Sequence, residues 1–196
     1  MKQQSLVPAR GWPDPGLMQI TPDTKDWTWV LDRPCPECGL DTSTFAPTDV
    51  PALLRENAAA WQEVLAGPHA RTRPDPTTWS PLEYAAHVRD VCRVYTERLH
   101  LMLTQDDPHY PNWDQDATAV EDRYAEQDPA TVAKELTEAA NHLADRFAEV
   151  TEWHRTGTRS DGAHFTIATF ARYFVHDPIH HLHDATTHAA PTETRG

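Results

Sequence analysis

Apolar residues recur every three or four positions in four long segments of the chain. This spacing places them on one face of an α-helix, whereas a half-buried strand would alternate apolar and polar residues. A shorter helix is expected near 118–126, in the polar connection between the second and third segments. The four predicted helices run over about 49–66, 80–104, 128–150 and 166–184.

Residues that cap helices stand at the start of the second and third predicted helices. Ser80 precedes Pro81, and Glu83 completes a capping box, in which side chain and backbone exchange hydrogen bonds. Asp128 and Pro129 repeat the cap and the first-turn proline at the third helix. Four long helices without a convincing strand indicate an all-α fold, a four-helix bundle. The short first connection predicts that the first and second helices are antiparallel neighbours.

The first 48 residues lack this periodicity. Seven of the chain's 17 prolines lie there, and proline fixes φ and removes a hydrogen-bond donor, so a long helix is excluded. Trp12, Trp27 and Trp29 are large apolar side chains that need packing partners. Residues 27–31 are expected to form a short strand. The predicted units are an irregular arm packed on the body, a four-helix bundle and a tail, over residues 1–48, 49–186 and 187–196.

Charge and composition exclude several classes of partner. The chain has 17 basic against 30 acidic residues, a net charge of −13, which repels nucleic-acid phosphates. No apolar run approaches the about 18 residues of a membrane span, and the first residues lack the apolar core of a signal peptide. We therefore expect a cytoplasmic protein that binds neither nucleic acid nor membrane. Three cysteines exclude a disulfide scaffold, whereas 12 histidines point to metal binding.

The histidines are densest near the C-terminal end of the fourth predicted helix. His176 and His180 are four residues apart, which places both rings on one helix face about 6 Å apart, close enough to share an ion. His87 flanks the apolar face of the second helix and points along the edge of the core. The alternative is a histidine-rich, exposed helix end. Independently of that choice, we expect His181, His183 and His188 to be exposed to solvent.

The apolar face of the fourth helix lies nearly opposite His176 and His180 on an ideal helix. Two explanations are open. The apolar face, with Phe170 and Phe174, forms a homodimer interface while the histidines face the bundle. Alternatively, Pro178 breaks the hydrogen-bond ladder and resets the helical register.

Two short motifs resemble the DinB-like superfamily, which includes mycothiol- and bacillithiol-dependent S-transferases and maleylpyruvate isomerase. The segment WSPLEYAAH over 79–87 looks like the start of that family's second helix, and FVHDPIHH over 174–181 looks like its second motif. The resemblance covers about residues 49–186. It implies a four-helix bundle in which one histidine of the second helix and two of the fourth hold a divalent metal. The residues that match these ligands are His87, His176 and His180.

The resemblance also implies a transferase that uses a low-molecular-weight thiol, such as mycothiol, to attack an electrophilic small molecule. A metal on three neutral histidines keeps positions open, as in catalytic zinc sites, and lowers the pKa of a bound thiol. Zinc is expected, and nickel, iron or manganese suit the same ligands. Two alternatives stay open: a non-catalytic module that binds metal or a small ligand in stress, and an iron-dependent oxygenase-type enzyme.

Two further sets of residues carry alternatives. Cys35 and Cys38 form a single CxxC in the arm, which is either completed by histidines as a second zinc site, or a redox pair, or two locally packed thiols. Asp114 and Asp116 either orient a metal-bound water or a ligating histidine, or simply form a turn and cap a helix. Tyr173 lies one turn before the histidine pair and either donates to a ligand or substrate, or only packs.

Overall fold

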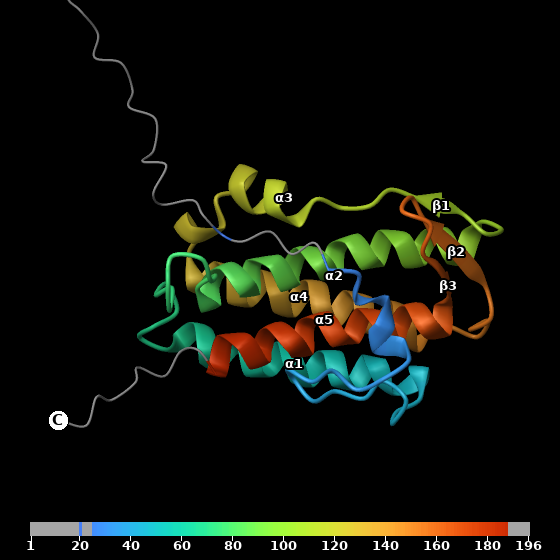
Figure 1. The fold of residues 1–196 in the computed structure, drawn as a ribbon, viewed down its shortest axis with the longest axis horizontal. Helices are drawn as coiled ribbons and strands as arrows, with labels where there is room; N and C mark the ends of the chain where they lie inside the picture. The colour runs from blue at the N-terminus through green and yellow to red at the C-terminus, as the bar shows by residue number, and fades with distance from the viewer. Residues whose placement is uncertain (1–19, 21–24, 188–196) are drawn as a thin grey trace, which may run out of the picture.

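Four long helices dominate the computed structural model, which describes residue 20 and residues 25–187 (Figure 1). The predicted bounds of all four are close to the observed ones, and the predicted all-α bundle is confirmed. None of the described helices is both long and apolar enough to cross a membrane. The four helices are α1 (Val50–Ala66), α2 (Pro81–Thr104), α4 (Pro129–Ala148) and α5 (Ile167–Thr187).

Part of the predicted arm and nearly all of the predicted tail lie outside the described residues. These parts are residues 1–19, 21–24 and 188–196. Trp12, which we expected to pack on the body, and His188, which we expected to be exposed, are among them.

The predicted helix caps are present. Ser80 Oγ accepts a hydrogen bond from the Glu83 backbone at 3.3 Å, and Glu83 Oε2 accepts one from the Ser80 backbone at 2.9 Å. Burial raises the pKa of Glu83, but hydrogen bonds from Arg73 and Ser80 lower it more, so the net shift is downward. Asp128 Oδ1 accepts from the Thr131 backbone at 2.9 Å and starts α4.

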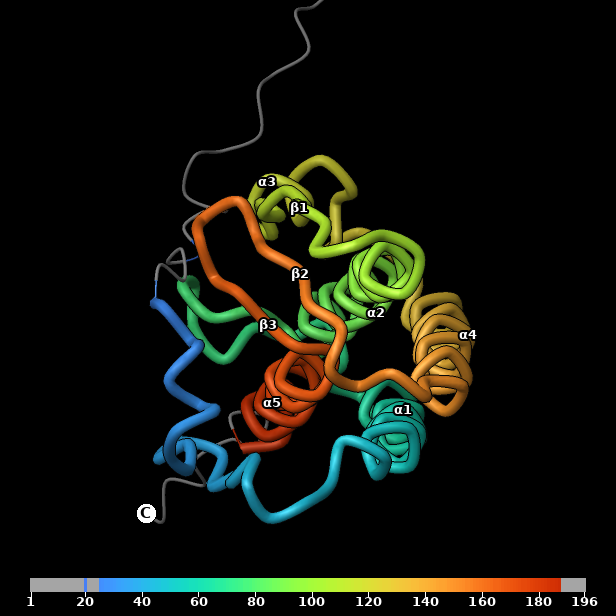
Figure 2. Tube along the Cα trace, turned by 90° about the vertical axis from the view of Figure 1, so that its right-hand side faces the viewer, coloured from blue at the N-terminus to red at the C-terminus, as the bar shows by residue number. Residues whose placement is uncertain are grey.

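The prediction that the first two helices are neighbours is wrong. Helices α1 and α2 each pack against both α4 and α5, and they lie diagonally across the bundle (Figure 2). The connection of residues 67–80 is long enough to cross the end of the bundle between them. Large side chains that are fully buried fill the space between the four helices, among them Trp61, Leu99, Phe147 and Phe170. The burial of each such side chain contributes about 1.5–3 kcal/mol to the free energy of unfolding, because its apolar surface is removed from water.

A small sheet closes one end of the bundle. Strand β2 (Thr156–Arg159) lies between β1 (His109–Tyr110), with which it is parallel, and β3 (His164–Thr166), with which it is antiparallel. A Cβ at Gly157 would lie 2.8 Å from Met102 Cγ, so glycine lets β2 pass close to α2. These strands have only two to four residues, too few to show periodicity in the sequence.

Short helical elements occupy the connections. The single helix predicted near 118–126 is divided into α3 (Gln115–Glu121), which lies over α2, and the 3-10 turn η4 (Tyr124–Glu126) (Figure 1). The division falls at Arg123, whose φ of 50° is left-handed and ends the α-helical path. A further 3-10 turn, η3 (Pro47–Asp49), leads into α1.

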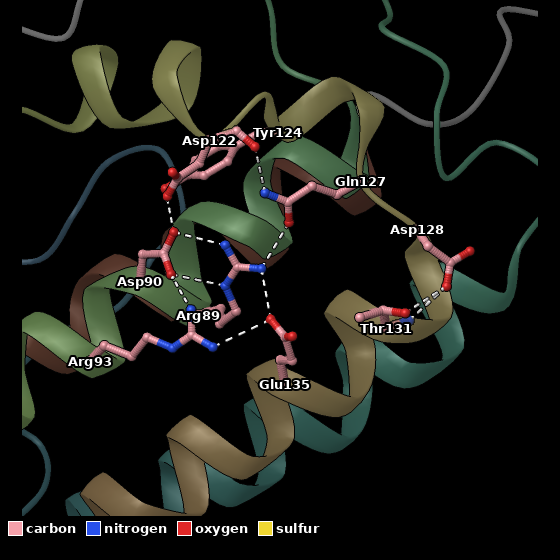
Figure 3. A network of polar contacts seen from close by, with 9 residues as sticks. All are labelled: Arg89, Asp90, Arg93, Asp122, Tyr124, Gln127, Asp128, Thr131 and Glu135. Atoms are coloured by element: carbon pink, nitrogen blue, oxygen red, sulfur yellow. Dashed lines mark hydrogen bonds and ion pairs between the residues drawn. The ribbon is translucent and has the colours of Figure 1, made fainter.

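A buried polar network ties the second connection to the bundle (Figure 3). Arg89 Nε and Nη2 donate to the two carboxylate oxygens of Asp90 at 2.9 Å. Tyr124 Oη donates to Asp90 at 2.7 Å. Arg89 Nη1 also donates to Gln127 at 2.8 Å and to Glu135 at 3.0 Å. The network therefore joins α2, η4 and α4.

The described part of the N-terminal arm lies along the outer side of α5 (Figure 2). The strand predicted at 27–31 is wrong, because Trp27–Leu31 form the 3-10 helix η2. Asp26 caps it by accepting from the Thr28 backbone at 2.9 Å, which favours a turn over an extended chain. Arg172 of α5 donates to the Phe45 carbonyl at 3.1 Å and holds the arm further along.

Candidate functional site

Helix α5 carries two pairs of candidate metal ligands, each spaced by four residues. His176 and His180 form one pair, and Asp177 and His181, one residue later, form the other. Successive residues lie about 100° apart around an α-helix, so the two pairs project from different sides of α5. The first pair meets the arm and the second meets α2. Pro178 lies within α5 without ending it.

On the α2 side, the bundle cluster consists of His87, Asp177 and His181. Their ligand atoms all lie within 4.8 Å of one another. Asp177 Oδ2 is 3.5 Å from His87 Nε2 and 3.8 Å from His181 Nε2. The rings of the two histidines meet edge-on with centroids 4.8 Å apart. Two helices thus bring three metal-ligating side chains to one point.

The charges of the bundle cluster suit a cation. His87 is fully buried, and burial lowers its pKa, so the ring is neutral near neutral pH. Burial raises the pKa of the Asp177 carboxyl, but His181 and His87 lower it more, to about 2. Asp177 is therefore an anion beside imidazole rings, a combination that divalent transition metals bind.

Three buried atoms of His87 and Asp177 lack a hydrogen-bond partner among the described residues. They are His87 Nδ1, His87 Nε2 and Asp177 Oδ1. Each unpaired buried polar group costs about 1–3 kcal/mol, so such groups rarely gather unless a further partner fits there. A metal ion would satisfy one ring nitrogen and the carboxylate, so these residues fit a metal.

Aromatic rings enclose the bundle cluster. Trp113 stacks on His87 with centroids 5.4 Å apart and planes inclined by 15°. Trp79 contacts the same ring at 5.3 Å. Tyr84 stacks on His181 at 5.0 Å. These contacts fix the orientation of both imidazoles.

A cavity of about 780 Å³ lies beside the bundle cluster, and Asp177 and His181 are part of its wall. The lining contains seven carboxylates and six aromatic side chains. Among the described residues it contains two cationic groups, Lys25 and Arg159, and Arg159 is paired with Asp161 at 2.8 Å. The negative lining favours neutral or cationic small molecules.

The acidic and tyrosine residues singled out in the sequence all line this cavity: Asp114, Asp116 and Tyr173. Asp114 Oδ1 accepts a hydrogen bond from the Ala117 backbone at 2.9 Å and caps α3, in agreement with the alternative that this aspartate caps a helix. Tyr173 Oη accepts a hydrogen bond from Arg159 at 3.2 Å.

On the outer side of α5, the arm cluster consists of Cys35, Cys38, His176 and His180. Their ligand atoms also lie within 4.8 Å of one another. Burial raises the pKa of the Cys38 thiol to about 11. Burial, together with the charge of His180, lowers the pKa of His176 to about 4. Without an ion, this thiol and this imidazole are both neutral near neutral pH.

The structure divides the predicted ligand set between the two clusters. His87 lies in the bundle cluster, whereas His176 and His180 lie in the arm cluster. Sequence reasoning missed Asp177 and His181 as partners of His87. The side chain of His181 is only 18% exposed, whereas we expected it to be solvated. The signal was present as a second four-residue spacing, offset by one from the histidine pair.

Neither explanation for the opposed faces of α5 is needed. Phe170 and Phe174 are 1% and 0% exposed and pack into the bundle, so they offer no surface to a second copy. Helix α5 is continuous through Pro178. His176 and His180 are buried on the opposite side because the arm covers them.

Comparisons with known proteins agree with this fold. A model of the DinB superfamily matches residues 54–185. Among solved structures, the chain is similar to YfiT from Bacillus subtilis, described as a probable metal-dependent hydrolase with an unusual four-helix bundle topology. The likeness has a TM-score of 0.67 and 18% sequence identity, and covers 72% of this chain and 85% of that chain. No curated protein matches the chain.

Proposed function

The chain belongs to the DinB superfamily, and from that premise we propose a metal-dependent enzyme that works with a low-molecular-weight thiol on an electrophilic small molecule. The bundle cluster would hold the metal, with zinc as the first candidate. The observation that carries the proposal is a set of buried donor atoms on His87 and Asp177, beside a large cavity, that have no hydrogen-bond partner in the part of the chain that the structure describes.

The donor set is that of a catalytic metal site. Two imidazoles and one carboxylate hold zinc in several hydrolytic enzymes and leave a position open for a further ligand. The same donors suit ferrous iron in oxygenases, and nickel and manganese also accept them. A divalent ion held there would lower the pKa of a thiol or a water molecule that reaches it, and would supply a nucleophile near neutral pH.

The chain's own residues orient the donors and select the reactants. Trp79 and Trp113 press on the His87 ring and keep it aimed at Asp177. The aromatic side chains in the cavity wall offer apolar surface to a bound electrophile. The excess of carboxylates repels anions, so the thiol and the electrophile are expected to be neutral or cationic.

A second candidate function is hydrolysis, in which water takes the place of the thiol. It is favoured by the likeness to YfiT, a probable metal-dependent hydrolase. Both reactions would use the same three ligands and the same cavity.

Metal analysis tests the site. Elemental analysis is made on the purified protein and on His87→Ala, Asp177→Ala and His181→Ala, with the exposed His100→Ala as matched control. Each cluster variant should lose about one equivalent of metal, and the control should lose none. Retention of all metal in the three cluster variants would contradict the proposal.

Turnover separates the functions. Protein loaded with zinc, iron, nickel or manganese is offered neutral and cationic electrophiles, and anionic ones as the comparison, with and without a thiol. Thiol-dependent turnover supports a transferase, and turnover without thiol supports a hydrolase. Oxygen-dependent turnover with iron alone would support an oxygenase instead. Metal binding without any turnover would leave a binding module and overturn the enzyme proposal.

A further inference from the structure

The arm cluster has the donor atoms and the spacing of a tetrahedral zinc site. Zinc binds sulfur at about 2.3 Å and imidazole nitrogen at about 2.0–2.1 Å, so a tetrahedral ion separates the two donors by about 3.6 Å. Cys35 Sγ lies 3.7 Å from His180 Nδ1. All four donors lie within 4.8 Å of one another, so little movement is needed to enclose an ion.

The arm presents both thiols from one tight turn. The Gly39 backbone donates to the Cys35 carbonyl at 2.9 Å, and the Cys35 backbone donates to the Leu40 carbonyl at 2.9 Å. Gly39 has a φ of +76°, a left-handed conformation that glycine adopts without strain. The chain therefore reverses directly after Cys38, and both sulfur atoms meet α5.

The histidines are prepared as ligands by their surroundings. His180 Nε2 lies 3.3 Å from Glu37 and 3.5 Å from Asp184, which leaves Nδ1 directed at Cys35. A carboxylate on the far nitrogen is the usual way in which proteins orient a metal-bound histidine. His176 is 4% exposed, and its Nε2 is buried without a hydrogen-bond partner among the described residues.

We propose that Cys35, Cys38, His176 and His180 bind a structural zinc ion that fastens the N-terminal arm to α5. As the ion binds, each thiol releases its proton to solvent and each sulfur forms a bond to zinc. Two thiolates, two neutral imidazoles and Zn²⁺ sum to zero charge, which suits a buried site. All four positions are filled by protein, as in closed structural sites.

A Cys35–Cys38 disulfide explains less of this geometry. It would use both sulfur atoms but leave His176 Nε2 buried with no hydrogen-bond partner from residue 20 or residues 25–187. Zinc satisfies all four groups at once.

The site also shapes the cavity. Lys25, Asp26, Trp27 and Glu37 of the arm form part of the cavity wall. The Trp27 ring packs on the arm-cluster histidines, with centroids 5.1–5.3 Å apart. The zinc ion would therefore hold one wall of the cavity in place. This inference is separate from the proposed function, because the two clusters share no ligand.

Cobalt substitution tests the site on the full chain. Metal-free protein is titrated with Co²⁺, and the thiolate-to-cobalt charge-transfer absorption is recorded in the near ultraviolet. The band should appear in the wild type, in His181→Ala and in Cys92→Ala. Cys92 lies on α2 and is buried in the core of the bundle. The band should weaken in Cys38→Ser, which keeps one thiolate, and should be lost when both Cys35 and Cys38 are replaced by serine. Absence of the band in the wild type, or its survival in the double variant, would overturn the proposal.

A measurement on the wild type guards against a variant that fails to fold. Native zinc-loaded protein is alkylated with iodoacetamide before and after chelation, and the peptide that contains Cys35 and Cys38 is examined by mass spectrometry. Both thiols should be protected by zinc and react after chelation. Equal reactivity in the two states, or a disulfide in freshly reduced protein, would refute a zinc site. Loss of metal in His181→Ala with protection intact would separate the two clusters.

Discussion

Replacing His87 with leucine should stabilise the metal-free protein. The His87 side chain is 0% exposed, and neither ring nitrogen has a hydrogen-bond partner among the described residues. Leucine has a similar volume and carries no polar atom. A residue kept for packing alone would show the opposite result, so the substitution separates a functional histidine from a structural one.

The magnitude follows from two opposing effects. Two unpartnered nitrogens cost about 2–6 kcal/mol, at about 1–3 kcal/mol for each group. Leucine gives up ring contacts with Trp79 and Trp113, each worth about 0.5–1.5 kcal/mol. With central values of about 4 and about 2 kcal/mol for the two effects, the metal-free variant should gain about 2 kcal/mol in the free energy of unfolding.

Zinc should reverse the order of stability. At a free concentration of 100 times Kd, an ion in the bundle cluster stabilises the wild type by about 2.7 kcal/mol. His87→Leu cannot gain this contribution. Zinc in the arm cluster stabilises both proteins alike and cancels in the comparison.

Urea unfolding followed by circular dichroism measures both states. With a slope of about 2 kcal/mol/M, a gain of about 2 kcal/mol should raise the urea midpoint of the chelated variant by roughly 1 M relative to the chelated wild type. The exposed His100→Leu is the matched control and should change neither midpoint. A chelated variant less stable than the wild type, or equal stabilisation of both by zinc, would refute the reasoning.

Three further predictions concern the polar network, a buried carboxylate and the carboxylate between the clusters. Tyr124→Phe should lower the free energy of unfolding in urea by about 1.5–3 kcal/mol, because it removes a hydrogen bond to the buried Asp90 carboxylate. An unchanged midpoint would show that this hydrogen bond does not stabilise the fold. Glu83 is paired with Arg73, and its pKa is lowered in the folded protein. Its contribution to the free energy of unfolding is therefore present above about pH 4.3 and is lost as the pH falls through the folded pKa. Glu83→Gln should therefore lower stability near neutral pH and flatten the fall in the urea midpoint between about pH 6 and about pH 3. Parallel curves of midpoint against pH for the wild type and the variant would contradict this prediction. Asp184 lies 3.5 Å from a histidine of each cluster, so Asp184→Asn should weaken metal binding at both by about 10-fold in a chelator competition; an effect at neither cluster would exclude that role.

Local pattern was sufficient for the helices and their starts. Ser80, Glu83 and Asp128 act within one turn of the chain, so the sequence alone contains the whole interaction. The apolar periodicity of α5 likewise placed Phe170 and Phe174 on one face, but it did not decide between a homodimer interface and the bundle core, where the structure buries both.

The division of the ligands depends on packing that local pattern does not contain. The His176–His180 and Asp177–His181 pairs have the same spacing and differ by one residue in register. Which pair meets His87 is decided by the rotation of α5 against α2, and that rotation is set by the whole core. Counting histidines therefore favoured the pair that the arm covers.

The arm cluster was open to prediction only in part. The CxxC showed that Cys35 and Cys38 could share an ion, but not which histidines complete the set. Cys35 and His180 lie 145 residues apart in the sequence, and no periodic signal connects them.

That separation fixes an order of assembly. Joining Cys35 to His180 before the bundle exists would close a loop of 145 residues, at an entropic cost of about 4 kcal/mol. The two histidines come within one turn of each other only after α5 is helical, so the unfolded chain has no ready metal site. With zinc in the arm cluster, we therefore expect the bundle to form first and the arm to dock afterwards. The arm, which precedes the bundle in the sequence, is then the last part to dock, and it supplies the final wall of the cavity.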